Sequence, residues 1–229
     1  MEEERRRTLY GRRRGKKLRA GQQSLLDTLL PRLALALPPV QQKIDLAQAF
    51  GGSLPPDGVW LEVGFGAGEH LVWQAEQHPG VGLIGCEPYL NGVAKCLAHI
   101  ERVGVANVRL FTDDARLLMA ALPARSLGRV FVLFPDPWPK TRHHKRRFVQ
   151  RETLDKLAEL MMSGAELRLA TDDPSYLPWM VEHACLHPAF EWLAERPADW
   201  WERPPDWPAT RYEQKEIAGR PAFLRLRRC

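Results

Sequence analysis

Short apolar runs alternate with amphipathic segments along the central part of the chain. Five runs, VWLEVG, VGLIGCE, NVRLFT, RVFVLF and ELRLAT, have the length and apolar character of buried parallel strands. Between them, apolar positions at helical spacing predict helices over 69–78, 90–103, 115–121 and 147–162. Strands that alternate with helices predict a doubly wound α/β fold, with a mostly parallel sheet and helices on both faces.

The flanking regions follow other patterns. Residues 22–50 have apolar positions at helical spacing and are interrupted at Pro38-Pro39, which predicts a helix followed by a second short one. Another helix is expected after Asp173, then a Trp/Pro-rich stretch over 192–208. The final segment PAFLRLRR alternates and is predicted to be an edge strand that can run antiparallel.

Composition sets the class of protein. The chain has 229 residues, of which 45% are hydrophobic and 27% charged, values typical of a globular protein. No apolar run approaches the roughly 20 residues that cross a bilayer, and the first residues resemble neither a secretory signal nor a transit peptide. The four cysteines form no CxxC pair, so neither a disulfide framework nor a zinc site is predicted. We expect a cytoplasmic protein without a metal and without a membrane segment.

Positive charge is concentrated in three clusters. The net charge is +5 and the pI about 9.2, with nine Lys or Arg between Arg5 and Arg19 and six between Lys140 and Arg151; the third cluster ends the chain. A solvated face, a flexible tail or a nuclear address would explain one cluster, but three favour a polyanionic partner. We assign residues 1–21 to a basic N-terminal arm, expected to contact RNA and to be dispensable for cofactor binding, and 22–229 to a single domain.

The first predicted strand ends in a glycine loop, LEVGFGAGEH. Gly64, Gly66 and Gly68 allow the backbone to approach a ligand closely. The dinucleotide fingerprint needs Gly or Ala where this chain has Glu69, so the loop alone is weak support for a nucleotide site. Glu62 is more informative, because a carboxylate there would oppose a pyrophosphate but suits a ligand with positive charge and no phosphate. S-adenosylmethionine (SAM), which carries an ammonium and a sulfonium, is such a ligand.

Two further strands also end in acidic residues. Glu87 lies nineteen residues beyond Gly68 and can accept two hydrogen bonds from a ribose diol. Asp113-Asp114 follow the third strand, where a carboxylate can pair with the adenine amino group. Each acid alone could equally be a helix N-cap or a solvated loop end. Acids at three successive strand ends beside a glycine loop predict a SAM-binding sheet.

The fourth strand leads into LFPDPWPKTRHHKRRF, where Asp136 stands between two prolines. Prolines restrict the backbone, so this carboxylate is held in place at the start of a basic segment. Trp138 could stack on a base or wedge beside it, and the basic run over 140–147 could hold phosphates. We expect His143 and His144 to add hydrogen-bond donors near phosphate rather than to perform acid–base chemistry.

Several segments resemble the tRNA (guanine-N7-)-methyltransferase family, in its bacterial single-chain form. FPDPWPKTRHHKRR is similar to the signature of that family, and YGRRRGKKLRAGQ to its basic N-terminal motif. EVGFGAGEHL resembles its SAM loop, ATDDPSY its fifth-strand motif and TRYEQK its C-terminal substrate motif. Together these segments cover most of the chain in the order of the family.

The resemblance implies a fold, a reaction and a set of site residues. The fold would be the seven-stranded sheet of class I methyltransferases, and the reaction transfer of a methyl group from SAM to N7 of a guanine in tRNA, which in the family is guanine 46 of the variable loop. Because its carboxylate is held between prolines, we predict that Asp136 is the catalytic residue, as a positioner and electrostatic stabiliser and not an obligate base. The implied SAM contacts are Glu62, the loop around Gly64, Glu87, Asp114 and Asp136. The implied substrate contacts are Lys140, Asp172, Thr210, Arg211, Tyr212 and Glu213.

Two other functions remain open from the residues alone. One is an RNA-binding module with a degenerate methyltransferase fold, although this chain retains Glu62, the glycines and Asp136. The other is a SAM-dependent enzyme with a different substrate; one that modifies an exocyclic nitrogen would be expected to carry Asn/Asp-Pro-Pro-aromatic after the fourth strand. The sequence leaves undecided which tRNAs are modified, whether the protein is a monomer or homodimer, and whether an accessory subunit is needed.

Two groups of residues outside these motifs have structural explanations. His183 and His187 are four residues apart on a predicted helix, but no third metal ligand or HExxH motif accompanies them, so we expect a structural role. Trp200, Trp201 and Trp207 are predicted to pack a loop over the sheet rather than to stack on bases.

Overall fold

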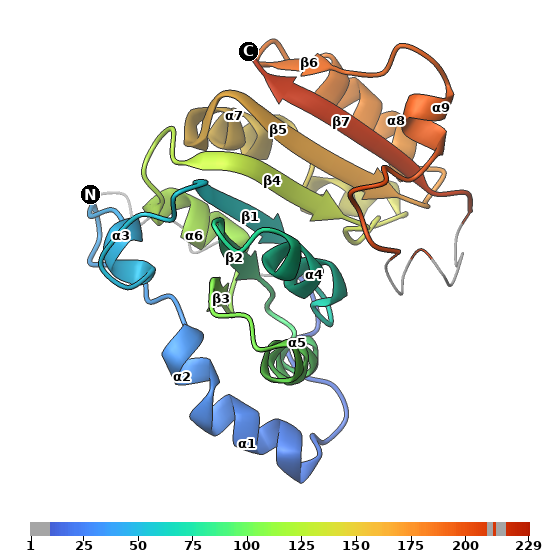
Figure 1. Cartoon of the computed structure of the whole chain (residues 1–229). Helices are drawn as coiled ribbons and strands as arrows, with labels where there is room; N and C mark the ends of the chain where they lie inside the picture. The colour runs from blue at the N-terminus through green and yellow to red at the C-terminus, as the bar shows by residue number, and fades with distance from the viewer. Residues whose placement is uncertain (1–9, 210–212, 214–218) are drawn as a thin grey trace.

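A computed structural model of the protein describes residues 10–209, 213 and 219–229. Within them, seven strands form one mixed sheet in the order β3-β2-β1-β4-β5-β7-β6 (Figure 1). The strands are β1 (Val59–Val63), β2 (Gly82–Cys86), β3 (Val108–Phe111), β4 (Leu127–Leu133), β5 (Met161–Thr171), β6 (Phe190–Trp192) and β7 (Ala222–Arg228). The first five strands pair in parallel, and β7 is antiparallel to both β5 and β6. The predicted doubly wound α/β fold with seven strands is therefore confirmed.

Helices cover both faces of the sheet (Figure 1). They are α1 (Ala20–Thr28), α2 (Leu30–Leu33), α3 (Leu46–Ala49), α4 (Glu69–Gln77), α5 (Leu90–Val103), α6 (Ala115–Ala121), α7 (Arg151–Leu160), α8 (Tyr176–Met180) and α9 (Ala198–Trp201), with a 3₁₀ helix η1 (Thr141–Arg146) and a π-helical turn η2 (Val181–Cys185). In the described part of the chain, none of these helices has both the length and the apolar character needed to cross a membrane.

The two faces of β1 belong to two separate cores. Leu61 packs into the core built with α6, α7 and α8, whereas Trp60 packs into the core built with α1, α2, α4 and α5. This division follows from the alternation of side chains along a strand. It also explains why the strand sequence is apolar at nearly every position, because both faces of a parallel sheet are covered.

The C-terminal strand differs from the prediction. We expected PAFLRLRR at the edge of the sheet, but β7 lies between β5 and the three-residue strand β6, which the sequence did not reveal. The arginines of this alternating strand pair with acids of the neighbouring strands: Arg225 lies 2.6 Å from Glu166, and Arg227 lies 2.9 Å from Glu191. The alternation of apolar residues and arginines along β7 therefore indicates that one face of the sheet is solvated here, and cross-strand ion pairs stabilise that face.

Several element boundaries also differ. The helix predicted over 147–162 begins only at Arg151, because the backbone is extended at Gln150 and the chain folds as η1 before it. Its C-terminal end passes directly into β5 at Met161, five residues before the predicted start of that strand. The region 22–50 is divided into α1, α2 and α3, and α1 begins at Ala20, inside the segment that we assigned to the basic arm.

Candidate active site

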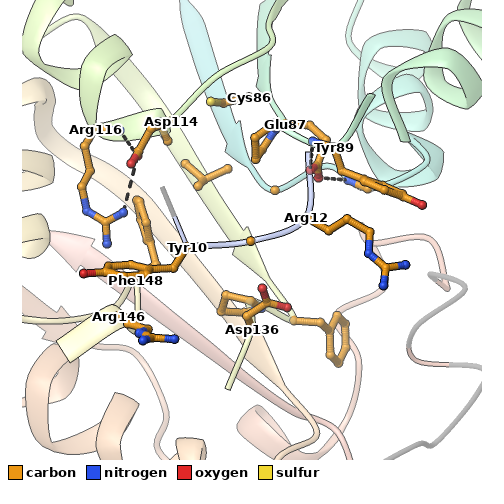
Figure 2. A pocket seen from close by; sticks show the side chains of 18 of the residues that line it. Tyr10, Arg12, Cys86, Glu87, Tyr89, Asp114, Arg116, Asp136, Arg146 and Phe148 are labelled. Carbon is orange, nitrogen blue, oxygen red and sulfur yellow. Dashed lines mark hydrogen bonds and ion pairs between the residues drawn. The ribbon is translucent and has the colours of Figure 1, made fainter. Parts of the chain in front are cut away.

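A cavity of about 410 Å³ lies where the parallel strands end. Figure 2 shows side chains from several separate segments facing it. Three of the predicted acids, Glu87, Asp114 and Asp136, line it together with Gly64 and Gly66. The cavity thus forms at the carboxyl ends of strands, where α/β sheets bind ligands.

The glycine loop after β1 has the backbone conformation that its sequence requires. Gly64, Gly66 and Gly68 have φ values of 77°, 57° and 82°, in the left-handed region where a side chain is strained. The loop is also closely packed from behind, because a Cβ at Gly92 of α5 would overlap with the backbone oxygen of Gly66. Gly92 was not recognised from the sequence, since a glycine near the start of a helix gives no specific signal.

Glu87 joins the glycine loop to the start of α5. Its two carboxylate oxygens accept backbone hydrogen bonds, from Gly66 N at 2.8 Å and from Tyr89 N at 2.9 Å. Burial raises the pKa of Glu87 and outweighs these two hydrogen bonds, and the nearby carboxylates of Asp136 and Glu62 raise it further. A carboxylate fixed in this way can accept hydroxyl hydrogen bonds at the remaining lone pairs.

Asp114 has the helix-capping role that we weighed against ligand binding. Its Oδ1 accepts a hydrogen bond from Arg116 N at 2.9 Å, which caps α6, and lies 3.4 Å from Arg116 Nη1. Its side chain also borders the cavity. Capping and cavity lining therefore coexist at this residue.

Asp136 lies on the side of the cavity opposite Asp114 and Glu87 (Figure 2). The backbone on either side of it is unusual, since Phe134 and Trp138 have φ values of 50° and 46° and each precedes a proline. Non-glycine residues seldom adopt this conformation, and such strain is concentrated at functional sites. Although Asp136 is exposed at the rim, the surrounding protein partly desolvates its carboxyl group and raises its pKa.

The N-terminal arm contributes to the cavity, which the sequence did not predict. Tyr10, Gly11 and Arg12 line it, and the arm crosses its opening (Figure 2). Four contacts fix the arm to the domain. Arg13 Nη2 lies 2.6 Å from Asp113 Oδ1, and the Arg13 backbone oxygen accepts a hydrogen bond from Leu90 N. Asn91 accepts a hydrogen bond from Gly15 N at its Oδ1 and donates one from its Nδ2 to the Lys16 oxygen. The arm therefore borders the cavity, in addition to the RNA contact that we expect of it.

The basic run after Asp136 meets the arm at the edge of the cavity. Arg146 lies between two aromatic rings, with its guanidinium carbon 4.4 Å from the centroid of Tyr10 and 5.0 Å from that of Trp138. Tyr10 and Trp138 are in edge contact at 6.3 Å. These cation–π and aromatic contacts connect two segments that the sequence separates by more than one hundred residues.

Glu62 and Gly68 are not among the residues that line the cavity. Glu62 is buried beneath the loop, where its Oε2 lies 2.7 Å from Nδ1 of His70. Gly68 caps α4 in a left-handed conformation, and a Cβ there would overlap with Cys96. A direct contact between Glu62 and SAM stays a prediction.

The three predicted substrate residues that the structure describes, Lys140, Asp172 and Glu213, are not among the residues that line the cavity. Lys140 is exposed immediately before η1, and Asp172 directly follows β5. Glu213 accepts a hydrogen bond from Arg203 Nε at 2.9 Å. Gly219 packs closely on Asp172, since a Cβ added at Gly219 would lie 2.9 Å from the backbone oxygen of Asp172. Thr210, Arg211 and Tyr212 lie outside the described residues.

Two sequence interpretations can be compared with side-chain contacts. His183 Nδ1 lies 2.9 Å from the Trp179 oxygen and its ring stacks on Trp179, whereas His187 Nε2 lies 3.1 Å from Asp155. These contacts support the structural role that we expected for both histidines. Trp207 is buried against Phe223, so the packing interpretation is confirmed for that tryptophan.

The fold is similar to those of solved RNA methyltransferases. An rRNA methylase from Streptococcus thermophilus aligns with a TM-score of 0.52 at 13% identity, covering 76% of this chain and 89% of that one. The 16S rRNA methyltransferase KamB aligns with a TM-score of 0.56 at 16% identity, covering 82% of this chain and 96% of that one. This similarity concerns the fold alone. Together with the cavity at the strand ends, it defines the fold class, which is that of the class I methyltransferases.

Sequence comparisons identify the family. A family model described as a putative methyltransferase matches residues 57–224. The chain is 54% identical over 221 residues to the tRNA (guanine-N(7)-)-methyltransferase of Paramagnetospirillum magneticum, covering 96% of this chain and 92% of that protein. It is 52% identical over 223 residues to the enzyme of the same name from Rhodospirillum rubrum, covering 96% and 87%. The chain belongs to the tRNA (guanine-N(7)-)-methyltransferase family.

Proposed function

We propose that the protein transfers a methyl group from SAM to N7 of a guanine in tRNA, at position 46 of the variable loop. The observation that carries the proposal is the convergence of Glu87, Asp114 and Asp136 around a glycine loop, in a chain about half identical to tRNA (guanine-N(7)-)-methyltransferases. When bound, SAM supplies an electrophilic methyl group on its sulfonium. The residues of the cavity bind and orient the reactants.

Different residues of the cavity contact different parts of the SAM molecule. Glu87 accepts hydrogen bonds from the ribose hydroxyls, because its oxygens are already directed by Gly66 and Tyr89. Asp114 pairs with the adenine amino group, and the positive-φ backbone at Gly64 and Gly66 provides room for the methionine part. Three carboxylates line this cavity, beside the guanidinium groups of Arg12, Arg116 and Arg146, and they supply hydrogen-bond acceptors for the hydroxyl and amino groups of SAM.

Asp136 acts on the guanine. Guanine N7 carries an in-plane lone pair and is an acceptor, so no proton has to be removed before it attacks the methyl group. Positive charge develops on the purine ring as the methyl group transfers. The carboxylate of Asp136 accepts hydrogen bonds from N1–H and the 2-amino group and stabilises that charge, which is electrostatic catalysis by a positioned group. Asp136 is thus a catalytic residue without being an obligate base.

The surrounding residues hold the tRNA. Lys140 and the cations of η1 bind flanking phosphates, and Asp172 and Glu213 help to dock the guanine together with Thr210, Arg211 and Tyr212. Residues 1–21 act as a basic arm that binds RNA and also closes the SAM cavity through Tyr10. An unpaired or loop guanine suits this site, because its base can be presented without opening a duplex.

The test is methyl transfer from labelled SAM to an unmodified tRNA transcript, followed by reduction and aniline cleavage to locate 7-methylguanine. We expect one modified guanine, in the variable loop. Methyl groups on another atom would overturn the assignment of N7, and tRNA binding without transfer would favour an inactive RNA-binding module. Calorimetry provides a second check, since SAM and S-adenosylhomocysteine should bind and NAD should not.

A further inference from the structure

A buried chain of polar groups runs from the glycine loop through α4 to the C-terminal segment. Glu62 Oε2 lies 2.7 Å from His70 Nδ1, and His70 Nε2 lies 3.2 Å from Gln74 Nε2. Gln74 Nε2 also donates to the backbone oxygen of Asp206 at 3.0 Å. Glu62, His70 and Gln74 are 2%, 3% and 0% exposed, so these contacts are made out of reach of bulk water. A polar chain this deeply buried is strongly sensitive to the loss of any one member.

The contacts of Gln74 determine which nitrogen of His70 carries the hydrogen. His70 and Gln74 are four residues apart and therefore lie on the same face of α4. The amide nitrogen of Gln74 faces both the Asp206 oxygen and His70 Nε2, and an amide nitrogen only donates. His70 Nε2 is therefore the acceptor, and the ring hydrogen is on Nδ1. From there it is donated to the carboxylate of Glu62.

The other end of the chain leads to the substrate side of the site. Asp206 precedes Trp207, whose buried ring lies in edge contact with His70 at 6.2 Å. Arg203 donates to the Trp207 oxygen at 2.7 Å and to Glu213 Oε1 at 2.9 Å. The position of Glu213 is therefore tied, through Arg203, to the same short segment that Gln74 holds against α4.

We propose that His70 and Gln74 are positioning residues for methyl transfer. His70 fixes the carboxylate of Glu62 beneath the glycine loop, and Gln74 fixes the segment that leads to Glu213. The inference rests on the proposed function, in which the loop holds SAM and Glu213 helps to dock the guanine. Helix α4 then keeps the binding sites of the methyl donor and the acceptor at a fixed distance and orientation. This matters because alignment of the reactants is the main task of an enzyme whose nucleophile needs no activation.

The experiment compares four variants: His70→Leu, His70→Asn, Gln74→Leu and, as a matched control, Gln77→Leu at an exposed position of the same helix. Calorimetry gives the Kd of SAM without tRNA, and steady-state methylation gives KM for tRNA and kcat. His70→Leu should weaken SAM binding about tenfold, the factor expected for a lost hydrogen bond to a charged group. His70→Asn should restore most of that affinity, because its amide N–H replaces the Nδ1–H.

Gln74→Leu should have a different signature. We expect a rise of about tenfold in KM for tRNA with a change of less than about twofold in the Kd of SAM, and Gln77→Leu should change neither. The proposal fails if His70→Leu and His70→Asn bind SAM equally well. It also fails if Gln74→Leu lowers the melting temperature and raises the KM for tRNA and the Kd of SAM by the same factor, since that result would indicate a general loss of stability. If the wild-type protein does not methylate tRNA, the proposed function is refuted instead, and the SAM measurements still decide the role of His70.

Discussion

Arg146 stacks on Tyr10, with 4.4 Å between its guanidinium carbon and the centroid of the ring. Tyr10 belongs to the N-terminal arm, and Arg146 to the basic run that follows Asp136. Both line the cavity, so segments that we propose to bind RNA also border the site in which we place SAM. We therefore expect RNA binding and SAM binding to share residues.

Removal of the arm should affect both ligands. We expect deletion of residues 1–19 to flatten the dependence of tRNA binding on log salt, because each lost phosphate contact lowers the slope by roughly 0.7–0.9. It should also weaken SAM binding, contrary to the expectation from composition alone.

The variant Tyr10→Ala isolates the effect on SAM binding. It should raise the Kd of SAM about two- to tenfold, because the cation–π contact between Tyr10 and Arg146 at the edge of the cavity is lost. Calorimetry with SAM measures it, with Arg14→Ala as the control; unchanged SAM affinity in both Tyr10→Ala and the deletion would exclude a role of the arm in the cavity.

The pKa of Glu87 predicts how SAM binding depends on pH. Burial raises this pKa, and the ribose needs the ionised carboxylate as its acceptor. As pH falls, Glu87 takes up a proton at a higher pH than an exposed glutamate would, and SAM affinity should begin to fall there. From neutral to moderately alkaline pH the affinity should be constant. Glu87→Gln should bind SAM weakly and lose this acid limb; a Glu87→Gln variant with the wild-type pH profile would assign the limb to another group.

The contact between Gly92 and Gly66 predicts a backbone requirement in α5. Gly92→Ala would push the helix away from the glycine loop, at a cost of about 1–3 kcal/mol in the free energy of unfolding and a weaker affinity for SAM. Gly21→Ala is the matched control, because Gly21 is also helical and has nothing within 4 Å of an added Cβ. That change should stabilise α1 by up to about 1 kcal/mol. Chemical denaturation and calorimetry distinguish the two, and equal effects would show that the close packing at Gly92 has no consequence.

The sequence predicted those parts of the fold that follow from local pattern. The five parallel strands and the helices between them are confirmed, since each has a continuous apolar run or a helical period. The strand β6, Phe190–Trp192, could not be predicted, because three residues are too few to show alternation. The position of β7 inside the sheet depends on pairing between distant segments, which no local pattern reports.

The site residues could be predicted where an acidic side chain directly follows a predicted strand. Glu87, Asp114 and Asp136 each follow a strand, so the rule that ligands gather at strand ends brought them together correctly. The roles of Tyr10 and Gly92 could not be predicted from the sequence, because they arise from contacts with residues far away along the chain. His70 escaped because a single histidine on a helix is most often a satisfied core residue, and only its place between Glu62 and Gln74 gives it significance.

Asp136 provides the most direct test of the mechanism. Asp136→Asn should fold normally and lose about 10²–10³ in kcat, the usual cost of removing one preorganised electrostatic contact. The asparagine would also turn donor hydrogens toward the donors of guanine. Asp172→Ala and Glu213→Ala should instead mainly impair guanine docking, seen as a higher KM for tRNA.

The pH profile of single-turnover methylation distinguishes a stabilising carboxylate from a general base. Because N7 needs no deprotonation, the wild-type rate at saturating SAM and tRNA should be nearly constant from neutral to moderately alkaline pH. Partial desolvation raises the pKa of Asp136, so the loss of rate on the acid side should begin at a higher pH than a fully solvated aspartate would give. Asp136→Asn should remove this acid limb while it lowers the plateau. A variant with the wild-type rate would exclude Asp136 from the mechanism, and a rate that rises continuously with pH would show that methyl transfer depends on a group that loses a proton in that range.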